Sequence, residues 1–222
     1  MVAIVEPPLN HMVLQGISWE TFERLLDEMG ERHFRMSYDN GDLEFMPLSY
    51  SYEHENYGKW IARLIFFVAL ELQMPIASGG STTLKQGLRR KGLEPDECFW
   101  IQHESAMRGK KKWTTLNNLP PDLAVEIDIT SSWLDHLGIY AALQVPEVWR
   151  FDGETLRVLI FGANGKYREK SKSAAFPTLS LVGFTKFITK LGSKDEVSLI
   201  QEFTAWLRAE VVGKTGRKNG KK

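Results

Sequence analysis

The segment from Tyr52 to Met74 repeats apolar residues with the period of an α-helix. These residues lie three and four positions apart: Ile61, Leu64, Ile65, Val68 and Leu72. The spacing places them on one wide helical face, which must be buried against other elements. We therefore predict a long central helix that Pro75 ends.

The patterns in the rest of the sequence predict several strands and four further helices. An earlier helix begins at Ser18, a favoured N-cap residue, and stops by Gly30. Two alternating runs around Asn40-Gly41 predict a β-hairpin, because this dipeptide accepts the positive φ angles of a type I′ turn. Further strands are expected within 76–85, 94–102, 123–129, 147–152, 155–161 and 166–170, with helices near 132–143, 182–191 and 194–210.

This order of elements predicts an α/β fold in which helices flank a mixed central sheet, followed by a C-terminal helical pair. We expect a main domain at 1–180, a helical extension that packs on it at 181–212, and a disordered basic tail at 213–222. The apolar residues of the last helix either form a homodimer interface or pack on their own domain: Val197, Ile200, Phe203, Trp206 and Leu207. Six aromatic residues are expected in the core: Trp60, Phe66, Phe67, Trp149, Phe151 and Phe161.

Composition excludes several classes of protein. The 28 basic and 28 acidic residues balance, so nucleic-acid binding would need a local basic patch. The single cysteine, Cys98, excludes an internal disulfide framework and is expected to be a buried, inert thiol. No secretion signal or membrane-spanning stretch is recognisable, and we expect a cytoplasmic protein without a membrane partner.

The segment PPDLAVEIDIT, at 120–130, threads acidic residues through an apolar strand. Buried carboxylates are costly unless they meet a cation or a hydrogen-bond partner. Asp122 follows Pro121 and is expected to turn the chain into the strand. Glu126 and Asp128 are two residues apart and share a face, and Asp128 is either an extra metal ligand or an acid at the strand end.

Asp96 begins another apolar strand, and acidic and imidazole groups open the long helix in the segment EHENY. Two acids from neighbouring strands make the oxygen-rich site that Mg²⁺ prefers. An ion held there can polarise a phosphodiester. Spacing alone does not separate this interpretation from a turn residue at a strand entrance.

Three motifs, EPDECFWI, PPDLAVEIDITSS and IYAALQVPEVWRFDG, resemble in this order the Uma-type family of restriction endonucleases, distant members of the PD-(D/E)xK nuclease superfamily. The likeness spans roughly residues 18–161. It implies a restriction endonuclease-like sheet with a divalent metal site at its edge. It also implies that Asp96 and Glu126 bind Mg²⁺ or Mn²⁺ with the Ile127 carbonyl as a third ligand, and that His54 or Glu55 reaches the site from the side.

The superfamily pattern has a lysine two residues after the second acid, and this chain departs from the pattern there. Asp128 occupies this position. Many family members place a lysine four residues before a tyrosine on the next helix, and alignment on Tyr140 puts His136 there. Histidine can act as base or proton donor near neutral pH, but is not a permanent cation. The basic clusters LRRKG and RGKKKW and the loop residue Lys85 are other sources of charge that could hold a phosphate backbone.

Two hypotheses follow. The first is a Mg²⁺- or Mn²⁺-dependent endonuclease that acts on nucleic acid, with DNA as the expected substrate. Its catalytic candidates are Asp96, Glu126, Asp128, His54 and His136. The second is a catalytically degenerate module of the same fold, which binds nucleic acid or protein and has lost the lysine.

Overall fold

The computed structural model describes residues 12–30, 34–47, 52–110, 119–128 and 134–216. Its central sheet contains β4 (Ala77–Ser78), β7 (Glu97–Trp100), β8 (Leu123–Ile127), β9 (Glu147–Phe151), β10 (Leu156–Phe161) and β11 (Tyr167–Lys170). The strand order is β11-β10-β9-β8-β7-β4. The sheet is mixed, because β8 and β9 are parallel and the other neighbouring strands are antiparallel.

A second, smaller sheet contains β1 (Met12–Leu14), β2 (Phe34–Asp39), β3 (Asp42–Pro47), β5 (Leu84–Gln86) and β6 (Lys91–Leu93), in the order β1-β3-β2-β6-β5. Helix α1 (Trp19–Glu28) covers one face of it, and Ser18 caps this helix as predicted. The predicted hairpin is confirmed, since Asn40 and Gly41 have φ angles of 49° and 115° between β2 and β3. The core under α1 consists of Phe22, Met36, Tyr38 and Leu43.

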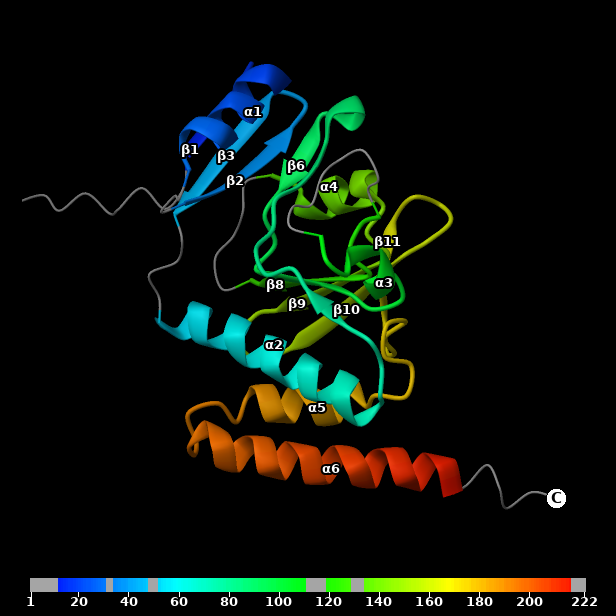
Figure 1. Ribbon diagram of the computed structural model, residues 1–222. Coiled ribbons are helices and arrows are strands. Elements are labelled where there is room, and N and C mark those ends of the chain that lie inside the picture. Colours follow the sequence, from blue (N-terminus) through cyan, green and yellow to red (C-terminus); the bar gives the residue numbers. More distant parts are fainter. Residues whose placement is uncertain (1–11, 31–33, 48–51, 111–118, 129–133, 217–222) are drawn as a thin grey trace, which may run out of the picture.

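Three helices cover one face of the central sheet: α2 (Tyr52–Glu71), α5 (Leu181–Ile188) and α6 (Glu196–Gly216). Figure 1 shows the three helices on the same side of the central strands, and Phe184 of α5 packs on Trp149 of β9. The predicted face of α2 is buried in the main core with Val125 and Ile127 of β8. Phe203 and Leu207 of α6 belong to the same core, so these residues pack on their own domain and are not available to a partner.

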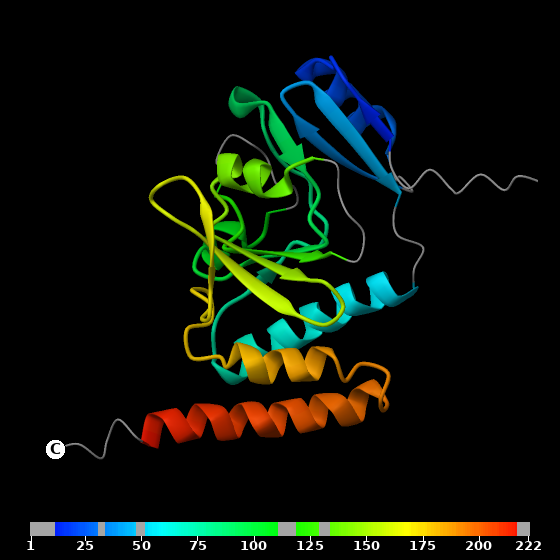
Figure 2. The same ribbon diagram turned by 180° about the vertical axis from the view of Figure 1, so that it is seen from behind.

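The opposite face of the central sheet is covered by α4 (His136–Leu143) and by β5 and β6 of the small sheet. Figures 1 and 2 show the small sheet and α4 on the side of the central strands away from α5 and α6. Two short helical turns, η1 (Gly87–Arg89) and α3 (Glu104–Met107), complete the described elements. Ala124 of β8 packs with Ile139, Tyr140 and Val148 on the α4 face.

The predicted α/β class, with a mixed central sheet, flanking helices and a C-terminal helical pair, is confirmed. The sequence interpretation contained a single sheet, whereas the structure has two, and β1 and β6 were not predicted. The long helix ends at Glu71 because Gln73 turns out of it with a φ of 53°. Phe66 was expected in the core but is half exposed. No helix in the described ranges combines the length and apolar character needed to cross a bilayer.

Candidate active site

Asp96 and Glu126 lie side by side on neighbouring strands of the central sheet. The antiparallel register of β7 and β8 pairs Glu97 with Val125. Continued by one residue, this register sets Asp96 opposite Glu126, and directly opposed residues project from the same face of a sheet. Val125 and Ile127 point into the α2 core, so Glu126 points to the α4 face.

The carboxylate of Asp96 is buried, with 4% of its side chain exposed. Its Oδ2 accepts a hydrogen bond from the backbone amide of Ile127 at 2.6 Å. Its Oδ1 accepts a hydrogen bond from Nη1 of Arg35 in a direct ion pair. Nε2 of His54 lies 3.6 Å from the same oxygen. A cation and a backbone donor therefore account for the burial of this acid.

Arg35 enters the site from β2 of the small sheet, and sequence reasoning missed it. Met36 and Tyr38 pack under α1. Arg35 and Ser37 alternate with them and therefore occupy the other face of the strand. Arg35 also interacts electrostatically with Glu126, Glu97 and His54. The alternation of polar and apolar residues in 34–39 was the available signal, but it does not reveal what the polar face covers.

Glu126 is held by two residues of α4. The hydroxyl of Tyr140 donates a hydrogen bond to Oε1 of Glu126 at 2.5 Å, and Nδ1 of His136 lies 3.6 Å from the same oxygen. Burial acts to raise the pKa of Glu126, but the hydrogen bond and charge of His136, the Tyr140 hydroxyl and Arg35 together lower it. The carboxylate therefore stays ionised at neutral pH.

His136 bridges the two sheets. Its Nε2 lies 3.1 Å from Oγ of Ser37 and 3.8 Å from Oε2 of Glu44. Burial acts to lower the pKa of His136, but the hydrogen bond and charge of Glu126, together with Glu44, raise it. Glu44 is fully buried on β3. The lysine position on the helix is thus filled by an imidazole whose positive form is favoured by two carboxylates.

The pKa of His54, near the start of α2, is shifted in the opposite direction from that of His136. Burial, followed by the positive charge of Arg35, lowers its pKa, while Glu55, a hydrogen bond with the backbone of Ile127, and Glu126 oppose the shift. His54 is therefore neutral near pH 7 and can accept a proton. Glu55 itself lies 3.6 Å from Lys59 on the surface of α2.

The other predicted acids have separate partners. Asp128 follows β8 and forms an ion pair with Arg150 of β9. Asp128, which occupies the lysine position, therefore has Arg150 as its own cation. Arg150 lies opposite Glu126 in the register of β8 and β9. Asp122 is buried and accepts hydrogen bonds from the backbone amides of Ile101 and His103, at 2.7 and 3.1 Å. Its role is structural, as expected, but it holds the loop after β7.

Several basic side chains of the predicted clusters have partners away from the acid pair, whereas Arg89 and Lys110 are exposed. Lys85 pairs with Glu23 of α1 at 3.0 Å. Lys91 pairs with Asp39 at the end of β2 remote from Arg35. Arg90 donates to the hydroxyl of Tyr38. Residues 111–118, which include Lys111 and Lys112 of the RGKKKW cluster, fall outside the described ranges.

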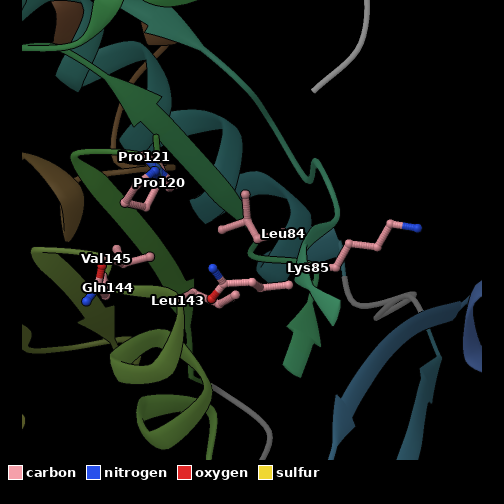
Figure 3. A pocket seen from close by; sticks show the side chains of 8 residues that line it. Leu84, Lys85, Pro120, Pro121, Leu143, Gln144 and Val145 are labelled. Carbon is pink, nitrogen blue, oxygen red and sulfur yellow. The ribbon is translucent and has the colours of Figure 1, made fainter. Parts of the chain in front are cut away.

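A small cavity of about 40 Å³ lies at the opposite end of β8 from Glu126. Figure 3 shows its lining, in which the Lys85 amine extends away from the other side chains. The residues around it are Leu84, Lys85, Gln86, Pro120, Pro121, Leu143, Gln144 and Val145. None is among the acids or imidazoles of the site, and the volume suits water rather than a nucleotide.

The described residues contain no group of three or more His, Cys, Asp or Glu side chains arranged to hold a metal ion. The oxygen donors present, the carboxylates of Asp96 and Glu126 and the nearby carbonyl of Ile127, nevertheless suit a hard cation. Mg²⁺ commonly takes one or two protein carboxylates and completes its shell with water and substrate oxygens. An ion bound at Asp96 would compete with Arg35 for the charge of this carboxylate.

Comparisons with known proteins identify the family and the fold. The family model described as "Uma2: Putative restriction endonuclease" matches residues 19–191. The structure resembles the crystal structure of a "putative nuclease belonging to DUF820" from Anabaena variabilis, with a TM-score of 0.55 and 16% sequence identity, over 78% of this chain and 99% of that one. At this identity the likeness shows a shared fold. No curated protein matches the chain.

Proposed function

Because the chain belongs to the Uma2 family, described as "putative restriction endonuclease", we propose that it hydrolyses phosphodiester bonds of nucleic acid, with DNA as the expected substrate, using Mg²⁺ or Mn²⁺. The observation that carries the proposal is the position of Asp96 and Glu126 on one face of adjacent strands. Two carboxylates beside two imidazoles suit metal-assisted hydrolysis.

In this proposal Asp96, Glu126 and the Ile127 carbonyl hold the ion, which supplies an acidified water and polarises the phosphate when bound. Asp96 is positioned by the Ile127 amide, and Glu126 by the Tyr140 hydroxyl. Each acid is therefore oriented by a donor other than the ion, as is usual around metal ligands.

His54 is the residue best suited to take a proton from the attacking water. It is neutral because burial and Arg35 lower its pKa, and its Nε2 lies 3.6 Å from Asp96. General-base catalysis needs such a group within reach of the water. His136 orients Glu126, and Asp128 neutralises Arg150 at the end of β8.

Cleavage of supercoiled plasmid and of single-stranded DNA, with Mg²⁺, Mn²⁺ or EDTA, tests the proposal. Asp96→Asn and Glu126→Gln should each reduce cleavage at least about 100-fold, because each removes a charged ligand. Glu196→Gln is the matched control, since Glu196 also pairs with an arginine, Arg63, but lies on α6. Cleavage that survives both site substitutions would exclude this mechanism.

A binding module without catalysis is the second candidate, and one contact favours it. Arg35 already neutralises Asp96, and the lysine position after β8 holds Asp128. Absence of cleavage with any ion, together with a steep fall in DNA affinity as salt rises, would favour this candidate. A homodimer also remains a prediction, which sedimentation equilibrium can check.

A further inference from the structure

Each acid of the pair Asp96 and Glu126 has a basic partner. Asp96 is paired with Arg35, and Glu126 with His136. Lys85 and Lys91 do not contribute, because each of them pairs with an acid elsewhere. Arg35 is thus the permanent cation that the fold places directly on one of the two acids.

We propose that Arg35 is a catalytic residue that binds the scissile phosphate and replaces the lysine missing after Glu126. The proposal rests on the proposed function, whose substrate is a phosphodiester. Arginine stays charged at any working pH, and its planar array of donors matches two phosphate oxygens. It is therefore suited to stabilise charge that develops on phosphorus oxygens.

Arg35 has donors to spare for such a contact. Its Nη1 donates to Asp96, but its Nε is a buried nitrogen without a hydrogen-bond partner among the described residues. A guanidinium offers five N–H donors, and a buried donor left without a partner often marks the place of a ligand. An oxygen-rich anion would satisfy this nitrogen.

Charge balance gives the same result. A divalent ion on Asp96 and Glu126 would match their two negative charges, so the guanidinium of Arg35 would lose its counter-charge. One phosphodiester group carries one negative charge and would restore neutrality. Arg35 therefore exchanges a protein carboxylate for a substrate phosphate when the site is loaded.

The small sheet has the geometry to keep Arg35 in place during this exchange. Neighbouring Met36 is buried under α1, and the backbone amide of Met36 bonds to Glu94 at 3.3 Å. Ser37 contacts His136. Because β2 is anchored on both sides of its chain, the guanidinium can change partner without movement of the strand. The substrate backbone is thus placed between β2 and the end of β8.

The first test is binding of an oligonucleotide duplex in Ca²⁺ over 50–250 mM KCl, a range of about fivefold. Arg35→Gln should weaken binding and reduce the salt slope by about 1, the value for one lost phosphate contact. Arg35→Lys should keep the slope because it keeps the charge. Arg208→Gln is the matched control, since Arg208 pairs with Glu71 far from the site, and should bind as the native protein does.

The second test is cleavage in Mg²⁺ or Mn²⁺. Arg35→Gln should lower kcat about 100-fold or more, and Arg35→Lys should lower it less. A folded Arg35→Gln variant with an unchanged salt slope overturns the proposal, even if cleavage falls, because Arg35 would then act only on Asp96. If this variant does not fold, the salt slope of Asp96→Asn is compared with that of the double variant Asp96→Asn, Arg35→Gln. In both proteins the ion pair between residues 35 and 96 is already absent.

These outcomes separate the two proposals. If the native protein binds the duplex but never cleaves it, the proposed function fails, and the salt slopes alone decide whether Arg35 contacts phosphate. If cleavage depends on Asp96 and Glu126 but Arg35→Gln retains native kcat, the proposed function stands and the role of Arg35 is overturned. If the native protein neither binds the duplex nor cleaves plasmid or single-stranded DNA, both are overturned.

Discussion

The carboxylate of Asp96 is bound to the backbone amide of Ile127 at 2.6 Å, across 31 residues of chain. The amide belongs to the residue that follows Glu126, so the same contact that fixes one acid also fixes the strand end that carries the other. The acid pair is consequently a property of the sheet rather than of a loop. Asp96 therefore contributes to stability, and in the proposed mechanism it also contributes to activity.

Substitution of Asp96 should separate these two roles. Asp96→Ala leaves the Ile127 amide and Arg35 without their partner, and should lower the free energy of unfolding by about 3–5 kcal/mol. Asp96→Asn keeps an acceptor for the amide and should cost about 1–3 kcal/mol. Urea unfolding measures both. A loss below about 1 kcal/mol in Asp96→Ala would contradict the contacts described for this carboxylate.

Tyr140→Phe should impair the site without unfolding the protein. It removes the hydroxyl that donates to Glu126 at 2.5 Å. Loss of such an orienting bond should reduce cleavage about 10–100-fold, with a stability loss of about 1 kcal/mol.

Tyr167→Phe is the matched control for this substitution. The hydroxyl of Tyr167 donates to the carbonyl of Val145, also at 2.5 Å. The control should show a comparable stability loss and retain native cleavage. Equal losses of cleavage in the two variants would contradict a specific role for Tyr140.

The stability contribution of His136 should depend on pH. Its pKa is raised because Glu126 and Glu44 outweigh the effect of burial and of nearby Arg150. Since the unfolded value is about 6.5, the protonated form stabilises the fold fully below that pH. The contribution is lost as pH rises through the raised, folded value.

Urea unfolding of the native protein and His136→Gln at pH 5.5 and 9 checks this prediction. The difference in unfolding free energy between the two proteins should be larger at the lower pH. A difference that grows toward pH 9 would show that His136 is held in its neutral form.

Gly183→Ala should destabilise the helical layer and leave the site intact. A Cβ atom at Gly183 of α5 would overlap with the indole ring of Trp206 on α6, so the ring or the two helices would have to shift. Overpacking of this kind costs about 1–3 kcal/mol. Thermal unfolding measures it, with the exposed neighbour Val182→Ala as control at less than about 0.5 kcal/mol. A native Tm in Gly183→Ala would show that the indole can move.

The sequence was informative where a local pattern determines structure. The apolar spacing of 61–68 predicted the buried face of α2, because the residues that share the face are neighbours on one helix. The two motif strands brought Asp96 and Glu126 onto a common sheet. Phe66 shows the limit of such patterns, since apolar character alone did not indicate that half of this residue faces solvent.

The part of the site that comes from the small sheet could not be found in this way. Alternation within 34–39 places Arg35 and Ser37 on one face of β2, and the hairpin register adds Glu44. Whether that face meets water or another layer depends on how the two sheets pack, which no local pattern records. The ion pair of Arg35 with Asp96 spans 61 residues.

The outer strands of the central sheet also limit how copies of this protein can associate. β4 has only two residues, and β11 carries Arg168, Glu169 and Lys170 along its exposed length. Edge strands that are short or charged pair poorly with a strand from another molecule. Self-assembly by extension of the central sheet, a route to fibrils, is therefore disfavoured at both of its margins.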